Sequence, residues 1–201
     1  MDDLDDKTVT ILLLGDSDVG KSTFLSRLSL GRRAPPDGKL PALRDFDQPF
    51  VFNVKMYNRP YRFEFYDTAS PQNYTLIQPD VLVLCFDISN RKTLYSLKTT
   101  WKGTVDGHFN KSEKVPVIVV GLKRDLRREW TEQERSSGVL GQSIMPQEGL
   151  RVAQEMRADR YAECSAVTGE LCQEVLEDIS RTAALTTTDA GGRTPGGCNA
   201  M

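Results

Sequence analysis

The chain of 201 residues has few of the residues that build disulfide scaffolds or metal clusters, since it contains four cysteines and one histidine. No pair of these cysteines has the spacing of a zinc motif or a disulfide framework, which predicts a reduced, cytoplasmic protein. Charge of one sign is also lacking: 26 basic residues stand against 28 acidic ones, which leaves no electrostatic argument for binding nucleic acid. No apolar run reaches the roughly eighteen residues that a membrane-spanning helix needs.

Apolar and polar segments alternate along the chain in a pattern typical of an α/β fold. The runs 81–86 and 115–120 are continuously apolar, as expected of central parallel strands covered on both faces. The pattern predicts strands at 8–14, 49–57, 60–66, 81–87, 115–121 and 160–164, and helices near 21–30, 92–108, 146–157 and 169–183. The alternation implies a mostly parallel, doubly wound sheet of about six strands with helices on both faces, and ligands at the carboxyl ends of the strands.

The alternating pattern predicts one domain, residues 7–185. Residues 1–6 form an acidic extension that lacks the basic and apolar regions of a signal peptide. Residues 31–48 are rich in glycine, proline and charge, which predicts a long loop. Residues 186–201 are mostly small and polar, which predicts a flexible tail.

The segment 15–22, Gly-Asp-Ser-Asp-Val-Gly-Lys-Ser, matches the phosphate-loop pattern G-x-x-x-x-G-K-[ST] at every fixed position. It lies between a predicted strand and a predicted helix, which is the context that the pattern requires. Its glycines allow main-chain N–H groups to point at phosphate oxygens, and the helix start adds partial positive charge. Lys21 is expected to reach the terminal phosphates and the Ser22 hydroxyl to ligate Mg²⁺. The sequence therefore predicts a site for the phosphates of a nucleotide.

A second group of residues selects the base of that nucleotide. Lys123 and Asp125 follow the predicted strand 115–121, at the edge of the sheet where ligands are expected. The Asp125 carboxylate can accept hydrogen bonds from N1–H and the 2-amino group of guanine, a match that adenine does not offer. The stem of Lys123 can lie along the base, and the segment 163–166, Glu-Cys-Ser-Ala, offers N–H groups to the guanine carbonyl. An adenine-nucleotide kinase is an alternative that Lys123 and Asp125 argue against.

In these motifs the chain resembles a small GTPase of the Ras superfamily, and within it the Rho branch. The segments 15–22, 67–69, 122–127 and 163–166 carry the resemblance, which covers about residues 7–185. It implies a P-loop NTPase G domain with an inserted helix at about 128–145. It also implies GTP or GDP with Mg²⁺ as ligands, and effector or regulator proteins as partners. The nucleotide-binding residues that it implies are Gly15, Asp18, Val19, Gly20, Lys21, Ser22, Thr23, Lys123, Asp125, Leu126, Ser165 and Ala166, and the metal-binding residues are Ser22 and Asp67.

The chain departs from the family in the loop that follows the first helix. No serine or threonine occurs between Ser29 and Thr68, so the threonine hydroxyl that completes the family's Mg²⁺ shell is missing. Counting back from Asp67 places Asp45 at that position, whereas counting forward from Lys21 places Leu40 there. A carboxylate at this position can meet the metal but repels the γ-phosphate.

The residues that perform hydrolysis also differ from the family pattern. Where the family has Gly-Gln after Asp-Thr-Ala, this chain has Ser70 and Pro71. Ser70 replaces the glycine whose N–H meets the γ-phosphate, and Pro71 replaces the glutamine that orients the attacking water and has no donor. Gln72, one residue later, is the predicted catalytic residue. Asp18 adds a negative charge beside the phosphates, and Leu122 replaces an asparagine that ties the base loop to the phosphate loop.

The groups that hold nucleotide are mostly kept, and the groups that hydrolyse it are mostly lost. The sequence therefore predicts a guanine-nucleotide-binding, Rho-like signalling protein with impaired or absent GTP hydrolysis. Two alternatives stay open. The first is an active GTPase switch in which Gln72 and a remodelled loop restore catalysis, and the second is a scaffold that binds no nucleotide.

The chain ends Cys198-Asn199-Ala200-Met201, which fits a C-terminal C-a-a-X box in which methionine favours a farnesyl group. A single lipid chain gives weak and reversible membrane binding. The expected location is therefore cytoplasmic, with peripheral contact on the cytoplasmic face of a membrane through a prenylated Cys198.

Overall fold

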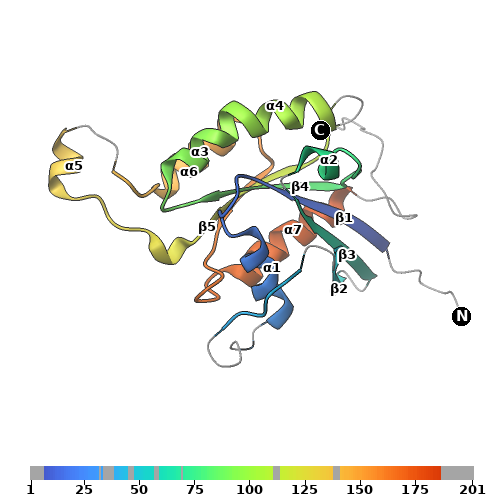
Figure 1. The fold of residues 1–201 in the computed structure, drawn as a ribbon. Coiled ribbons are helices and arrows are strands. Elements are labelled where there is room, and N and C mark those ends of the chain that lie inside the picture. Colours follow the sequence, from blue (N-terminus) through green and yellow to red (C-terminus); the bar gives the residue numbers. More distant parts are fainter. Residues whose placement is uncertain are drawn as a thin grey trace, which may run out of the picture.

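The computed structural model describes residues 7–31, 33, 39–44, 48–56, 59–68, 70–110, 114–137 and 141–186 (Figure 1). Within these residues, one six-stranded sheet has the strand order β2-β3-β1-β4-β5-β6. β2 and β3 pair antiparallel, and every other neighbouring pair is parallel. The strands are β1 (Lys7–Leu14), β2 (Phe50–Met56), β3 (Arg59–Asp67), β4 (Val81–Asp87), β5 (Val117–Leu122) and β6 (Arg160–Glu163). The predicted, mostly parallel sheet is confirmed.

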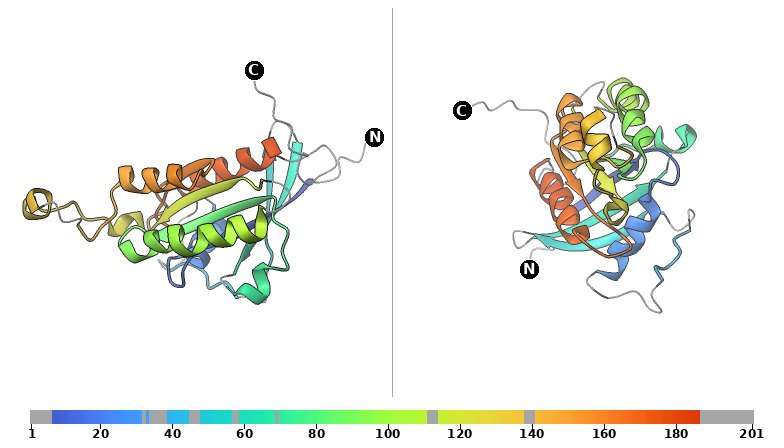
Figure 2. Two further views of the ribbon diagram at one scale, coloured as in Figure 1. Left: turned by 90° about the horizontal axis from the view of Figure 1, so that it is seen from above. Right: turned by 90° about the vertical axis from the view of Figure 1, so that its left-hand side faces the viewer.

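Helices cover both faces of this sheet (Figures 1 and 2). The α-helices of the described residues are α1 (Lys21–Leu30), α2 (Pro71–Tyr74), α3 (Arg91–Ser96), α4 (Lys102–Thr104), α5 (Glu132–Ser137), α6 (Pro146–Glu155) and α7 (Cys172–Thr186). Two π-helical stretches, Leu97–Trp101 and Val105–Phe109, make α3 and α4 parts of one continuous helical segment. This segment and α6 pack on one face of the sheet, and α1 and α7 pack on the other.

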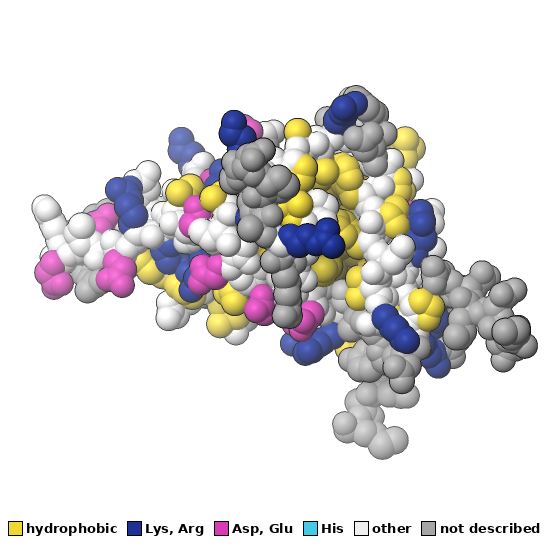
Figure 3. All heavy atoms as spheres, turned by 90° about the horizontal axis from the view of Figure 1, so that it is seen from below, with side chains coloured by type: hydrophobic (Ala, Val, Ile, Leu, Met, Phe, Trp, Pro, Cys, Tyr) yellow, Lys and Arg dark blue, Asp and Glu magenta, His cyan; other side chains and the backbone are white. Residues whose placement is uncertain are grey.

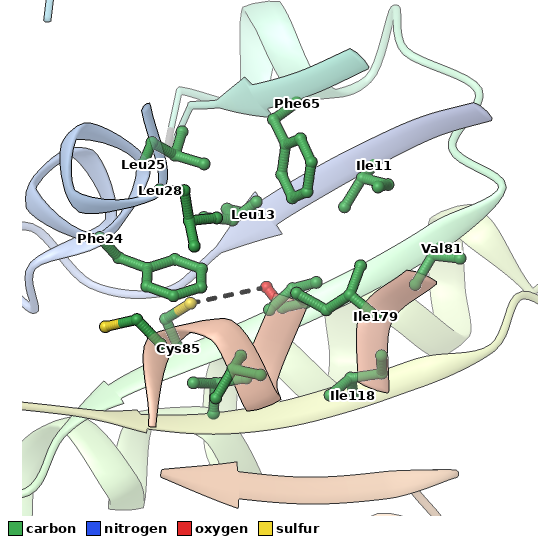
Figure 4. Packing of buried hydrophobic residues seen from close by; sticks show 14 of the residues in the cluster. Ile11, Leu13, Phe24, Leu25, Leu28, Phe65, Val81, Cys85, Ile118 and Ile179 are labelled. Atoms are coloured by element: carbon green, nitrogen blue, oxygen red, sulfur yellow. Dashed lines mark hydrogen bonds between the residues drawn. The ribbon is translucent and has the colours of Figure 1, made fainter. Parts of the chain in front are cut away.

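Strand β1 illustrates why the two layers of helices are needed. Successive side chains of a strand point to opposite faces of the sheet. Ile11 and Leu13 therefore enter the core shared with α1 and α7 (Figure 4), whereas Leu12 and Leu14 enter the core shared with the α3–α4 segment and α6. All four side chains are fully buried. The continuously apolar strands of the sequence are thus explained by a sheet covered on both faces.

The strand predicted over 115–121 begins two residues later, at Val117. Pro116 has no N–H to donate to a neighbouring strand, so regular pairing of β5 begins only at the next residue. Its carbonyl oxygen still accepts a hydrogen bond from the N–H of Leu82, at 2.9 Å. The predicted start of the strand was wrong because an apolar run does not show whether each residue has an N–H that can donate a hydrogen bond.

The helix predicted over 169–183 begins at Cys172 instead. Gly169 has φ +82° and Leu171 has φ +59°, and a right-handed helix excludes both values. The turn that precedes α7 is therefore built from left-handed backbone. This correction concerns function, because the turn follows directly on the predicted base-recognition segment 163–166.

The loop predicted over 31–48 is partly anchored on the body of the protein. Leu40 and Leu43 pack against the core that α1 and α7 share. The hydroxyl of Ser26, on α1, donates to the carbonyl oxygen of Pro41 at 2.6 Å. The described middle part of the loop therefore has a fixed position beside α1.

The surface is mixed in charge. On the face shown in Figure 3, Lys and Arg side chains are interspersed with Asp and Glu side chains, in agreement with the near-neutral composition. Helix α5 stands away from the body at the end of a long excursion of the chain (Figure 2). No helix among the described residues is both long enough and apolar enough to cross a membrane.

Candidate functional site

The phosphate-loop segment connects the carboxyl end of β1 to the start of α1. Gly15 and Gly20 have φ of +145° and +106°, values that favour glycine. A side chain at Gly15 would also collide with the main chain of Cys85, since a Cβ there would lie 2.3 Å from the carbonyl oxygen. The buried ammonium of Lys21 donates to the carbonyl oxygens of Gly15 and Asp16, at 3.2 and 3.0 Å. Lys21 therefore lies over the loop, where a nucleotide phosphate would meet it.

Ser22 and Asp67, the predicted metal-binding pair, lie in contact. The Ser22 hydroxyl donates to Oδ2 of Asp67 at 2.5 Å, and Nζ of Lys21 lies 3.9 Å from Oδ1. Within the described parts of the chain, no three His, Cys, Asp or Glu side chains gather to hold a metal by themselves. A hydroxyl and a carboxylate suit Mg²⁺, which takes oxygen ligands and shares them with phosphates and water. These two side chains fit Mg²⁺ together with a nucleotide.

The side chain of Gln48 holds the main chain of Asp67, a role that the sequence did not predict. Nε2 of Gln48 donates to the Asp67 carbonyl, and the Asp67 N–H donates to Oε1, both at 2.9 Å. The β2–β3 ladder pairs Phe50 with Phe65, and continuing this register places Gln48 opposite Asp67. The carboxamide therefore supplies the two hydrogen bonds that a strand main chain supplies in a ladder. Because Asp67 also pairs with β1, its main chain is fixed on both sides.

We expect Gln48→Leu to loosen Asp67 and hence to weaken Mg²⁺ binding. Loss of two hydrogen bonds should lower the free energy of unfolding by about 1–3 kcal/mol, measured by urea denaturation. The Mg²⁺ concentration at which nucleotide release is slowed by half should rise about tenfold. The reason is that Gln48 does not bind the metal but holds Asp67, the predicted metal ligand, in place. Asn53→Leu, at an exposed amide of β2, is the matched control. A destabilised Gln48→Leu protein with unchanged Mg²⁺ dependence would show that Gln48 supports only the fold.

The predicted base-recognition residues meet beside the phosphate loop. Nζ of Lys123 donates to the main-chain carbonyl of Asp18 at 2.6 Å and pairs with Oδ2 of Asp87 at 2.8 Å. The fully buried hydroxyl of Ser165 donates to Oδ1 of Asp125 at 2.5 Å. Lys123 therefore joins the base loop to the phosphate loop, and Ser165 orients the carboxylate predicted to recognise guanine.

The other predicted nucleotide-binding residues differ in their exposure. Val19 and Ala166 are buried, whereas Thr23 is exposed on α1 and Leu126 is 50 % exposed. The side chains of Asp18, Ser22 and Asp125 are exposed as well. Outside the described part of the structure lie the side chain of Gln72 and the residues Asp45, Ala69 and Cys198. What the sequence predicts for these four positions stays a prediction.

Trp101, the last residue of the π-helical stretch after α3, also bonds the phosphate loop. Its ring is buried, and its indole N–H donates to Oδ1 of Asp16 at 2.9 Å. Tyr74 of α2 packs against the same indole, with ring centroids 6.2 Å apart. The phosphate loop is therefore held from the side of the α3–α4 segment, and α2 contacts the residue that holds it. No local motif marks this contact, because 85 positions separate donor and acceptor.

Cys85 lies directly beneath the phosphate loop and remains a neutral thiol. Burial raises the pKa of this thiol to about 12, the nearby Lys21 ammonium lowers it, and the Asp67 carboxylate raises it again. A thiol with this pKa forms almost no thiolate at neutral pH. Cys85 is therefore a packing residue of the site rather than a nucleophile.

A glycine loop shaped for phosphates, joined through Lys123 to a carboxylate suited to guanine, defines a G domain of the P-loop nucleotide-binding class. The model of the Ras family matches residues 10–185. The chain therefore belongs to the Ras family, and it is a small GTP-binding protein. Proteins of this family bind guanine nucleotide, usually with Mg²⁺.

Proposed function

We propose that this chain is a Rho-like member of its family that binds GTP or GDP with Mg²⁺ and hydrolyses GTP slowly or not at all. In this role it is a nucleotide-loaded module that effector or regulator proteins recognise. The observation that carries the proposal is the start of α2. Ser70 and Pro71 stand where the family has Gly-Gln, and Pro71 begins a helix of four residues.

The hydrogen bonds around α2 support slow hydrolysis. The N–H of Ser70 donates to the Thr68 hydroxyl at 3.3 Å, so it is engaged within the loop instead of facing a γ-phosphate. The Ser70 carbonyl accepts the N–H groups of Asn73 and Tyr74, both at 3.0 Å. Pro71 occupies the first helical position, which suits proline, but it brings neither an N–H nor a carboxamide. Hydrolysis needs a group that orients the attacking water, and this position supplies none.

The Rho-like part of the proposal is supported by helix α5. This helix lies within the segment 128–145, where the Rho branch carries an inserted helix (Figure 1). Arg91 anchors the segment, since its guanidinium donates to the carbonyl oxygens of Gly141 and Ser143, at 2.8 and 3.0 Å. It also pairs through two nitrogens with the carboxylate of Glu148, at 2.7 and 3.0 Å. The insert is therefore joined to α3 and α6 by specific contacts.

The protein should be purified without added nucleotide and denatured, and the released nucleotide should be identified by chromatography. Stoichiometric GTP is the expected result, because a protein that binds GTP without hydrolysing it keeps the GTP captured in the cell. GDP would show that turnover survives, and single-turnover hydrolysis by Gln72→Ala would then test Gln72. Release of no nucleotide would favour the scaffold alternative.

We expect the double variant Ser70→Gly, Pro71→Gln to hydrolyse GTP at least about tenfold faster than the parent protein. It restores an unhindered main chain beside the γ-phosphate and a carboxamide that can orient water. The measurement is phosphate release in a single turnover with Mg²⁺. Pro146→Gln changes the exposed first residue of α6 and should leave the rate unchanged. Equal slow rates in parent and double variant, with GTP bound to both, would contradict the role assigned to α2.

A further inference from the structure

Arg27 is a buried cation whose partners are main-chain carbonyl groups. It lies on α1 and is only 5 % exposed. Its Nε donates to the carbonyl oxygen of Ala166 at 2.5 Å, and its Nη2 donates to that of Val167 at 2.6 Å. Among the described residues no carboxylate pairs with it. The turn before α7 passes close by, since a Cβ at Gly169 would lie 3.6 Å from the guanidinium carbon.

A buried guanidinium without a carboxylate is costly, and an apolar side chain of similar size is often less so. Arg27 offsets this cost through two charge-assisted hydrogen bonds, which are stronger than bonds between neutral groups. The main effect of Arg27 is therefore to fix the positions of two carbonyl groups of the base-recognition loop relative to α1. The same helix begins with Lys21 and Ser22, so the base-recognition loop and the phosphate site share one rigid element.

The direction of these carbonyl groups sets the direction of an N–H group. In a planar trans peptide the C=O and N–H bonds point to opposite sides, so the N–H of Val167 points away from Arg27. Among the described residues, neither the N–H of Ala166 nor that of Val167 has an acceptor. The next N–H, that of Thr168, donates to the Ser165 hydroxyl at 3.2 Å. Among the described residues, the Val167 N–H is thus a free donor on the side opposite Arg27, and the neighbouring Ala166 N–H is a second free donor of the same loop.

We propose that Arg27 determines specificity for guanine by aiming the Val167 N–H at the 6-carbonyl oxygen of the base. Asp125 receives the neighbouring N1–H and the 2-amino group on the same edge of the base. Arg27 does not touch the base, so it is a positioning residue that acts through the main chain. The inference rests on the proposed binding of guanine nucleotide, and it identifies the contact that selects oxygen at position 6.

The test compares three diphosphates in the full-length protein: GDP, 6-thio-GDP with a weakly accepting sulfur at position 6, and IDP without the 2-amino group. Arg27→Met keeps an unbranched stem, although it is shorter than that of arginine, and removes all the donors. We expect the Kd values for GDP and IDP to rise alike, by about tenfold. The Kd for 6-thio-GDP should change less than about twofold, because sulfur gains little from an aimed N–H. The ratio of the Kd for 6-thio-GDP to the Kd for GDP should therefore fall. The ratio of the Kd for IDP to the Kd for GDP, which depends on Asp125, should stay the same.

Equal weakening of all three diphosphates would overturn the inference, because Arg27 would then support only the fold of the loop. Arg151→Met, at an exposed arginine of α6, should leave all three Kd values unchanged. If Arg27→Met does not fold, Arg27→Lys is used, since it keeps the charge but loses the planar fork of donors. The same pattern at smaller size is expected, and an equal loss for all three ligands again overturns the inference.

The use of diphosphates separates this result from the proposed lack of hydrolysis. A parent protein that hydrolyses GTP contradicts the proposed function and leaves the pattern of Kd values as the test of Arg27. A parent protein that binds none of the three diphosphates contradicts both.

Discussion

Asp125→Asn is expected to change the base preference of the protein from guanine to xanthine. The Asp125 carboxylate accepts from two donors of guanine, N1–H and the 2-amino group. An asparagine turns its own NH₂ group toward one of these donors, which leaves two donors facing each other. Xanthine has a carbonyl oxygen in place of the 2-amino group, so it accepts from this NH₂ group while its N1–H donates to the amide oxygen.

The expected change is at least about 100-fold in the ratio of the Kd values for GDP and xanthosine diphosphate, because a polar match is replaced by a mismatch in a desolvated site. Competition against a fluorescent GDP analogue measures both values. The Ser165 hydroxyl, which donates to Oδ1 of Asp125, also orients the new amide with its oxygen toward Ser165. Asp106→Asn, at an exposed carboxylate paired with Lys102, is the control. Unchanged guanine preference in Asp125→Asn would show that another group selects the base.

Gly15→Ala should strongly destabilise the protein. The added Cβ would lie 2.3 Å from the carbonyl oxygen of Cys85, and this oxygen belongs to the central strand β4. The backbone at Gly15, with φ +145°, also disfavours any side chain. Strain and overpacking together should lower the free energy of unfolding by about 3 kcal/mol or more, and nucleotide affinity should fall with it.

Urea denaturation of the nucleotide-free protein measures this loss, and Gly103→Ala is the matched control. Gly103 lies in α4, and a Cβ there meets no atom within 4 Å. Alanine should therefore raise the free energy of unfolding by about 0.5–1 kcal/mol through its higher helix propensity. A Gly15→Ala protein as stable as the parent would mean that the loop can move away from β4, contrary to the geometry described.

Local patterns predicted the elements and the motifs of the site. Continuous apolar runs marked β4 and β5, because these strands are buried on both faces. The phosphate loop and Asp125 were found because each belongs to a short motif with fixed spacing. Errors arose where one residue overrides a pattern: Pro116 shortens β5, and the positive φ at Leu171 delays α7.

Three contacts that shape the site were beyond sequence reasoning. Gln48 reaches Asp67 across 19 positions, Trp101 reaches Asp16 across 85, and Arg27 reaches Ala166 across 139. Each contact depends on strand register or on helix packing, which a single sequence does not specify. A glutamine, a tryptophan and an arginine outside any motif give no signal of their own. Packing assembles this second set of residues around the motifs.

The contact between Trp101 and Asp16 gives the protein its own optical probe. The chain has two tryptophans, and the indole N–H of the other, Trp130, donates to the Ser143 carbonyl in the insert at 2.9 Å. The phosphate loop and the insert therefore each have one tryptophan beside them. Indole fluorescence responds to the polarity and hydrogen bonding around the ring, so each tryptophan reports on its own region. In a Trp130→Phe protein the remaining indole emission comes from Trp101, beside the phosphate loop. Arrival and departure of a nucleotide can then be followed without attaching a dye to either the protein or the ligand.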